Sequence, residues 1–222
     1  MKRATILAAF ALAAAPVLAA AAQEEFRWTG KVAAGQAIEI KGVNGGITAT
    51  GSAGGDVEVT AVKKGRKSDP TEVKVEVVEH AGGVTICAVY PSDGAPNECA
   101  PGKAGRMRVR DNDVNVEFRV KVPAGVRFVG RTVNGGIEAS GLKADAEAET
   151  VNGGIDVSMP EGLSADVRAS TVNGDISTDF PLTVKGKIAR RKLEGTIGSG
   201  GRLLEMKTVN GGIELKKAGP SL

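Results

Sequence analysis

The chain has 222 residues, of which 41% are hydrophobic and only 3% aromatic, and it contains 31 glycines. This length allows one domain or two small ones, and a core of Val, Ile, Leu and Ala suits stacked β-sheets better than a rounded globule. The formal net charge of +3 includes Lys2 and Arg3 of the N-terminal segment. The remaining chain therefore lacks the basic excess that binding to nucleic-acid phosphates needs, and we expect no nucleic-acid partner.

Residues 1–22 have the pattern of a secretory signal peptide. A basic start at Lys2 and Arg3 precedes an apolar run from Ala4 to Ala19, and three alanines before Gln23 suit a cleavage site. A membrane anchor is the alternative, but the run is short for the about 20 apolar residues of a spanning helix. We expect export to the periplasm, the cell surface or the medium, with no transmembrane segment after cleavage.

Residues 23–122 form the predicted N-terminal portion, which is rich in β-strands. Alternation of apolar and polar residues predicts strands at Val57–Val62, Val73–Val78, Val84–Val89 and Val114–Val122. Because no shared motif links these strands, we expect them to be antiparallel, with long connections. They would cover the N-terminal end of a stack, where an exposed edge would otherwise pair with other chains.

The two cysteines, Cys87 and Cys99, flank a turn-rich stretch that contains Pro91, Gly94 and Pro96. An exported chain meets an oxidising environment, so we predict a disulfide between them. A closed loop of this size stabilises the fold by about 3 kcal/mol. A metal-binding or redox pair is the alternative, but the CxxC spacing is missing.

A short motif recurs along the chain and dominates residues 123–222, the predicted C-terminal portion. The copies are Val43–Ile47, Thr132–Ile137, Thr150–Ile155, Thr171–Ile176 and Thr208–Ile213, with a decayed copy at Leu193–Ile197. Counted at the asparagine position, the copies after residue 123 are 16 to 21 residues apart. Such a period is typical of stacked-repeat architectures.

The apolar pattern shifts by one residue inside each copy. Ala146 and Ala148 share one parity before Thr150, and Val151 and Ile155 share the other parity after it. A one-residue slip sends the following side chains to the opposite face unless the backbone turns there. We therefore predict a corner at each Thr-Val step, with a strand on either side.

Asparagine and glycine follow each corner, and both tolerate left-handed backbone conformations. The predicted turn residues are Asn44, Gly45, Asn134, Gly135, Asn152, Gly153, Asn173, Gly174, Asn210 and Gly211. Stacking of successive coils would place Asn134, Asn152 and Asn173 one strand spacing apart, about 4.8 Å, so that their amides form a hydrogen-bonded ladder. A meander of β-hairpins is the alternative, but the apolar flanks are asymmetric about each Asn-Gly pair.

These patterns predict an all-β fold, a parallel β-solenoid-like stack of roughly 20-residue coils with an antiparallel β-rich N-terminal and middle portion. We expect residues 23–122 and 123–222 to form one continuous domain. At the C-terminal end, Lys216, Lys217 and Pro220 are residues that typically blunt an open sheet edge.

The "TVNGGI" repeats, the segment "VEFRVKVPAGVRFVGRTVNGGIEA" and the signal-peptide pattern resemble the bacterial "putative adhesin" domains of unknown function, relatives of the head domains of auto-transporter adhesins. The resemblance extends from Phe26 to Leu215. It implies an exported, all-β, β-solenoid-like protein of the cell envelope. The family offers no agreed catalytic residue.

A row of acidic residues follows the motif isoleucines. Glu138, Asp156 and Glu214 each come directly after such an isoleucine, with Ser177 in the place of an acid and Asp175 nearby. We interpret the row as a solvated face of the stack. A weak calcium site and a carboxylate pair that cleaves polysaccharide are the alternatives.

The remaining candidates are one histidine and one basic cluster. His80 has no nucleophile nearby in the sequence, so we expect an ordinary strand-end residue. The basic cluster Lys185–Lys192 suits the binding of anionic polysaccharide or lipid head groups. A solubilising edge is the alternative for this cluster. We expect a non-enzymatic, adhesin-like envelope protein that acts through flat sheet faces, without catalytic residue, cofactor or metal. Its expected partner is cell-surface polysaccharide or an envelope protein. A carbohydrate-active enzyme and an assembly protein that pairs by its sheet edges are the alternatives, and the sequence leaves the oligomeric state open.

Overall fold

The computed structural model describes residues 23–184 and 190–218, so the predicted signal peptide, most of the basic cluster and Pro220 lie outside the described residues. The described chain contains 17 β-strands and one short 3-10 helix, η1 (Pro70–Glu72). This content confirms the predicted all-β class. In the described part of the chain, no helix combines the length and the apolar character that a membrane crossing requires.

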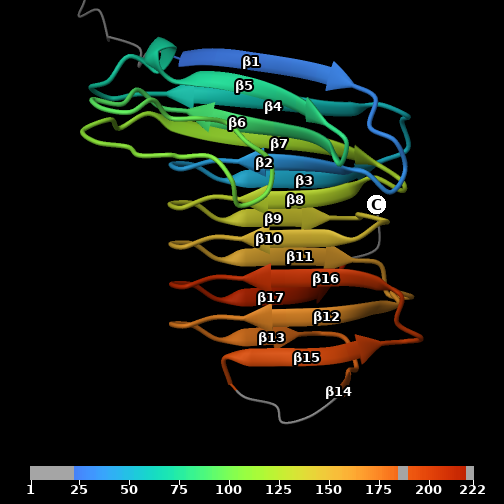
Figure 1. Ribbon diagram of the computed structural model, residues 1–222. Coiled ribbons are helices and arrows are strands. Elements are labelled where there is room, and N and C mark those ends of the chain that lie inside the picture. The colour runs from blue at the N-terminus through green and yellow to red at the C-terminus, as the bar shows by residue number, and fades with distance from the viewer. Residues whose placement is uncertain (1–22, 185–189, 219–222) are drawn as a thin grey trace, which may run out of the picture.

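The strands form two open sheets that enclose a shared core and stack into an elongated body (Figure 1). In spatial order, sheet A contains β1 (Gln23–Gly30), β4 (Val57–Lys64), β7 (Asn115–Pro123), β3 (Ile47–Ser52), β9 (Ile137–Ser140), β11 (Ile155–Met159), β17 (Ile213–Lys217) and β13 (Ile176–Thr178). Sheet B contains β14 (Thr183–Val184), β15 (Lys192–Ile197), β12 (Ala165–Ser170), β16 (Arg202–Lys207), β10 (Ala146–Glu149), β8 (Arg127–Arg131), β2 (Ala37–Lys41), β6 (Gly83–Val89) and β5 (Lys74–His80). Neither sheet closes into a barrel.

Parallel coils build the centre of the stack. In each coil the chain follows a strand of sheet B, turns, and continues along a strand of sheet A. Within the described residues, five coils turn at a motif copy, and the coil from β6 to β7 turns through residues 90–114, which we call the excursion loop. Neighbouring coils pair in parallel in both sheets. The predicted solenoid-like stack is confirmed.

In each of the five coils that turn at a motif copy, the motif isoleucine begins the sheet A strand and packs in the core. Ile47, Ile137, Ile155 and Ile213 share one register on neighbouring strands, and all four are buried. Burial of one such side chain contributes about 2 kcal/mol relative to exposure. The one-residue parity change in the sequence therefore marks the corner at which the inward face passes from sheet B to sheet A.

The coils are not stacked in chain order. Their spatial order is β6–β7, β2–β3, β8–β9, β10–β11, β16–β17 and β12–β13. The coil that comes first in the chain, β2–β3, is second in the stack, and the coil that comes last in the chain, β16–β17, is second from the opposite end. Figure 1 shows the red β16 and β17 between β11 and the orange β12. The expectation that Asn152 and Asn173 are neighbours is wrong, because Asn210 lies between them. Coils with the same motif offer one another equivalent hydrogen bonds, so the repeat period cannot determine their order.

The decayed copy at Leu193–Ile197 is not a corner, contrary to expectation. It lies within β15, which pairs with β12 in a continuous antiparallel ladder. In that ladder Gly195 lies opposite Val167. The segment has glutamate in place of the motif asparagine, so the corner hydrogen bond of the other copies cannot form.

The predicted edge residues Lys216 and Lys217 do not lie at a sheet edge. They belong to β17, which lies between β11 and β13. The outermost strands are β1 and β13 in sheet A and β5 and β14 in sheet B. At the C-terminal end, β13 has three residues and β14 has two, and such short edge strands limit pairing with other chains.

The strands of the middle portion divide into two kinds. As predicted, β4 is antiparallel to β7, and β5 is antiparallel to β6. However, β6 and β7 are parallel to β2 and β3 and form a coil of the stack. Apolar alternation is the same in parallel and antiparallel strands, so the sequence pattern did not distinguish the two arrangements.

Candidate functional site

Five asparagines form a continuous ladder along one corner of the stack. Their backbones are bridged in the order Asn44, Asn134, Asn152, Asn210 and Asn173. At each step a side-chain amide donates a hydrogen bond of 2.8–2.9 Å to the side-chain oxygen of the neighbouring coil. A ladder of this kind pairs the polar groups of adjacent coils and holds the coils in register.

The glycine after each asparagine is required by the close approach of neighbouring coils. Gly45 and Gly211 use the positive φ that glycine tolerates, at 122° and 157°, whereas none of the five motif asparagines has a positive φ. A Cβ at Gly153 or Gly174 would lie 2.1 or 2.0 Å from a carbonyl oxygen of the adjacent coil. At the next position, the nearest atom to a Cβ on Gly154 is 3.5 Å away. This space is consistent with the side chain of Asp175 at the second glycine position of one copy.

The motif threonines complete the corner. The buried hydroxyls of Thr132, Thr150, Thr171 and Thr208 each donate to the carbonyl of the first motif glycine in the neighbouring coil, at 2.8–2.9 Å. These hydrogen bonds satisfy backbone acceptors that the turn leaves without a strand partner. The threonine, asparagine and glycine of the motif therefore have structural roles.

The motif valines point outward from the same corner. Val133, Val151, Val172 and Val209 are 37–54% exposed. Within residues 23–184 and 190–218 they are the large apolar side chains that are exposed. Along the stack they follow the order of the asparagine ladder. The corner thus exposes a narrow apolar row beside the asparagine amides.

The excursion loop is closed on itself at its two ends. Cys87 and Cys99 form the predicted disulfide, with their Cα atoms 5.7 Å apart. The hydroxyl of Tyr90, the first residue of the loop, donates to the carbonyl oxygen of Val114, its last residue, at 2.8 Å. Burial raises the pKa of Tyr90 to about 12, so its hydroxyl remains a donor at neutral pH.

A lysine of sheet B fixes the loop to the outer face of the sheet. The Nζ of Lys41, in β2, donates to the carbonyl oxygens of Ala100, Gly102 and Ala104 at 2.8, 3.0 and 2.8 Å. Burial lowers the pKa of Lys41. Because the three acceptors are backbone carbonyls of residues 100–104, one loop segment accepts hydrogen bonds from all three N–H groups of the Lys41 ammonium.

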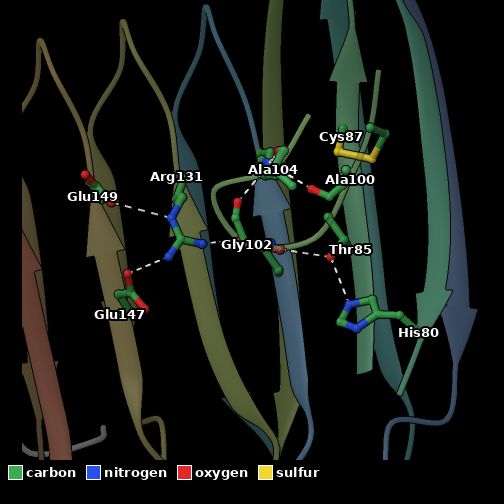
Figure 2. Close-up of polar contacts among 12 residues, drawn as sticks. His80, Thr85, Cys87, Ala100, Gly102, Ala104, Arg131, Glu147 and Glu149 are labelled. Carbon is green, nitrogen blue, oxygen red and sulfur yellow. Dashed lines mark hydrogen bonds and ion pairs between the residues drawn. A yellow bond between two sulfur atoms is a disulfide. The ribbon is translucent and has the colours of Figure 1, made fainter. Parts of the chain in front are cut away.

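Beside Lys41, Glu39 is 5% exposed and links its own strand, β2, to three other elements. Its Oε2 accepts hydrogen bonds from the Thr85 hydroxyl at 2.9 Å and from the Gly102 N–H at 2.8 Å. Its Oε1 pairs with the Arg131 guanidinium. Figure 2 shows Arg131, Gly102 and Thr85 converging on this point beneath the loop. The carboxylate therefore connects β2, β6, β8 and the excursion loop.

His80 supports the same network from the end of β5. The N–H of Gly82 donates to its Nδ1 at 3.1 Å, and its Nε2 lies 3.1 Å from the Thr85 hydroxyl oxygen. With Nδ1 as an acceptor, the neutral ring donates from Nε2 to Thr85, which in turn donates to Glu39. His80 therefore orients the threonine that holds the buried carboxylate.

Arg131 extends the network across the stack. Its Nη2 lies 2.5 Å from Glu147 Oε1, and its Nε lies 3.5 Å from Glu149 Oε2, an ion pair without hydrogen-bond geometry (Figure 2). Removing such charges from water is unfavourable, and their mutual pairing offsets that cost. Sequence reasoning missed this cluster because Glu39 lies on the outward face of β2, where Thr85, Arg131 and the returning loop meet it from distant parts of the chain.

A preformed hollow of about 400 Å³ lies between the excursion loop and the corner. Its lining combines apolar, basic and acidic side chains, among them Val133, Val151, Met107, Lys103, Arg106 and Glu149. Lys41 and Arg131, which the network holds in place, form part of its wall. The network thus shapes a cavity in the range typical of ligand sites.

The acidic row predicted from the sequence is brought together on the outer face of sheet A. Asp156 lies in register between Glu138 and Glu214, and Ser177 follows Glu214. Lys216 pairs with both Glu214 and Asp156, and its hydrogen bond lowers the pKa of Glu214. Across residues 23–184 and 190–218, no three His, Cys, Asp or Glu side chains are grouped so that they could hold a metal ion.

Three residues of the basic cluster lie within the described part of the chain. Arg190 pairs with the exposed Asp175 at 2.8 Å, and Lys192 pairs with Glu194 at 3.4 Å. These two cations therefore already have acidic partners on the surface.

Comparisons with known proteins support the resemblance carried by the motif. Residues 131–216 match the model of the family "Toastrack DUF4097", which confirms the similarity to an adhesin-like domain family of unknown function. Among solved structures, a "putative cell adhesion protein" from Clostridium sporogenes has 11% identity and a TM-score of 0.47, over 88% of this chain and 100% of that one. A "putative adhesin" from Bacteroides fragilis has 11% identity and a TM-score of 0.31, over 88% and 97%. No protein of curated function matches the chain.

Proposed function

We propose that this chain is an exported, non-enzymatic protein of the cell envelope that binds a cell-surface polysaccharide or an envelope protein. Its principal binding surface is the face of sheet B under the excursion loop. The observation that carries the proposal is the hollow of about 400 Å³, whose wall is fixed by the pairing of Glu39, Lys41 and Arg131 with the loop and the sheet.

Fixing the loop in advance favours binding. A long connection that must order itself on contact loses conformational entropy, which weakens the complex. Here the disulfide, the Lys41 hydrogen bonds and the Glu39 carboxylate hold the loop before any ligand arrives. Val133 and Val151 add apolar surface to the polar lining, and this mixture is typical of ligand sites.

The outer face of sheet A offers a second, flat contact area. Its strands present polar side chains in register, including the rows Thr48–Glu138–Asp156–Glu214 and Thr50–Ser140–Ser158–Lys216. Rows at strand spacing suit repeated contacts with an extended ligand. In this proposal sheet A contributes area, and the loop face contributes specificity.

A non-enzymatic role agrees with the chemistry of the acidic row. General acid catalysis in sugar cleavage needs a carboxyl group that stays protonated near neutral pH. Lys216 instead lowers the pKa of Glu214 and pairs with Asp156. Both groups are exposed or half-exposed on a flat face.

The proposal is tested by binding of the chain from Gln23 to envelope fractions and to a glycan array. Val151→Glu places a charge in the hollow, where an unpaired carboxylate is unfavourable, and should weaken binding at least about tenfold. Val172→Glu is the matched control, because it changes the same motif position in a coil away from the hollow. It should bind like the unchanged chain.

Two results would overturn the proposal. The first is a folded chain that binds neither polysaccharides nor proteins of the envelope. The second is equal weakening by both substitutions, which would assign binding to the corner as a whole and not to the hollow. Export is tested separately by N-terminal sequencing of the cellular protein, which should begin near Gln23.

A further inference from the structure

The excursion loop carries three arginines on one side of an extended segment. The segment reads "RMRVR", in which Met107 and Val109 are half-buried and pack against the core. Arg106, Arg108 and Arg110 alternate with them and are exposed. In extended backbone, residues two apart point the same way at a separation of about 6.6 Å. The segment therefore presents a row of three guanidinium groups.

These arginines line a hollow of their own. It has a volume of about 270 Å³ and lies between the arginine row and residues 91–95. Within the described residues, no ion pair involves Arg106, Arg108 or Arg110. Asp93 is the one acidic residue in the lining. The hollow thus combines three cations that lack carboxylate partners with a single acid.

The backbone under the row is held firmly. The Asn97 side-chain amide donates to the carbonyl oxygens of Tyr90 and Arg108 at 2.9 and 2.7 Å, and the Arg108 N–H donates to Asn97 Oδ1 at 2.6 Å. Glu98 and Arg106 form a backbone bridge beside it. One asparagine therefore joins the beginning of the loop to its arginine segment and sets the distance across the hollow.

We propose that this arginine row binds an anionic polysaccharide through the repeated carboxylate or phosphate groups of its chain. The inference rests on the proposed function and names its ligand class. Guanidinium groups form paired hydrogen bonds with carboxylate and phosphate oxygens. Three unpartnered guanidinium groups in a row match a ligand whose charges repeat along its length, whereas a single small anion would occupy only part of the row.

The row continues toward the larger hollow. Arg106 lines both hollows, and Lys103 lines the larger one. A chain that lies along the arginines would therefore lead into the cavity under the loop, where Val133 and Val151 contact its apolar surfaces. The two hollows form one extended site, with the charged recognition at its outer end.

The experiment measures binding of the chain from Gln23 to polygalacturonate, which carries carboxylates, and to a phosphomannan, which carries phosphates, by calorimetry, with neutral dextran as the uncharged comparison. We expect binding to at least one anionic chain, no binding to dextran, and weakening by added sodium chloride. Arg108→Gln should weaken binding about tenfold, because it removes a charge-assisted pair. Arg119→Gln is the matched control, since Arg119 is an exposed arginine on sheet A that no ion pair of the described residues involves. It should leave the affinity unchanged.

Several outcomes would overturn the inference. Equal weakening by Arg108→Gln and Arg119→Gln would mean general charge attraction. Full competition by inorganic phosphate would mean a site for a single anion. Loss of binding to anionic lipid vesicles in Arg108→Gln, with polysaccharide binding intact, would identify a lipid head group instead. Envelope binding that Val151→Glu weakens and Arg108→Gln does not would leave the proposed function standing and refute this inference alone.

Discussion

Replacement of the first motif glycine tests whether close approach between coils dictates the motif. In Gly153→Ala, the new Cβ would lie 2.1 Å from the carbonyl oxygen of Gly135 in the adjacent coil, nearly an ångström inside the shortest contact that a Cβ makes. Gly154→Ala changes the next residue, where the nearest atom is 3.5 Å away. The two variants add the same methyl group one residue apart.

The size of the effect follows from the hydrogen bonds that cross this corner. Relief of the overlap requires the coils to separate by roughly an ångström. This separation breaks the 2.8 Å bonds from Thr150 to the Gly135 carbonyl and from Asn152 to Asn134. Each bond contributes about 1 kcal/mol, and the steric strain adds about 1–3 kcal/mol. We expect Gly153→Ala to lower the free energy of unfolding by about 3 kcal/mol or more, and the melting temperature by about 6–12 °C.

Urea unfolding of the chain from Gln23, followed by circular dichroism, measures both variants. Gly154→Ala should change the free energy of unfolding by less than about 1 kcal/mol, with a gain where the alanine restricts the unfolded chain. The midpoints are compared at equal m-values, so that a shift reports stability. A Gly153→Ala variant within about 0.5 kcal/mol of the unchanged chain, or equal losses in the two variants, would refute the reasoning.

Further outcomes follow from the ladder, the loop and its charges. Asn152→Ala removes two amide hydrogen bonds and Asn173→Ala removes one. At about 1 kcal/mol per bond, the loss in the free energy of unfolding, measured in urea, should be about twice as large for Asn152→Ala. Equal losses would contradict the ladder. Reduction of the disulfide should lower the free energy of unfolding by about 3 kcal/mol, measured with and without reductant. Glu39→Gln leaves the guanidinium of Arg131 less compensated and should cost about 2 kcal/mol; trypsin should also cleave the excursion loop faster, and an unchanged rate would show that Glu39 does not hold the loop. The Ser68 backbone N–H holds the pKa of the Asp113 carboxyl below its ordinary value of 3.8, so this stabilisation is present above that pH and lost as the pH falls through the folded-state pKa. The melting temperature of the unchanged chain should fall as the pH enters that acidic range, and the melting temperature of the Asp113→Asn variant should fall less.

The features that the sequence predicted correctly depend on near neighbours in the chain. The parity change at Thr150 located the corner between β10 and β11, because a side chain's face follows from its position along the strand. The asparagine ladder was predicted for the same reason, although its order was wrong. Cys87 and Cys99 were paired correctly because the chain offers no other cysteine.

The candidate site was predicted far less well. Glu39 and Lys41 occupy the outward positions of β2, and their sequence pattern is that of solvent-exposed residues. Glu39 is buried and Lys41 is half-buried because the excursion loop returns over sheet B, and Gly102 and Ala104 reach these two residues across about sixty residues of chain. The alternation of "RMRVR" was available in the sequence as a signal for an extended segment with one charged side, but its position beside a hollow was not.

The sequence by itself determined the all-β class, the faces of the strands and the corners, because alternation and turn chemistry act over a few residues. The tertiary structure alone decided the order of the coils, the parallel placement of β6 and β7, and the burial of the Glu39 and Arg131 charges. The physical reason is the equivalence of the repeats. Any two coils whose corners have the same threonine, asparagine and glycine can form the same hydrogen bonds, so only the long connections and the packing of the whole stack select the neighbours that β16 and β17 acquire.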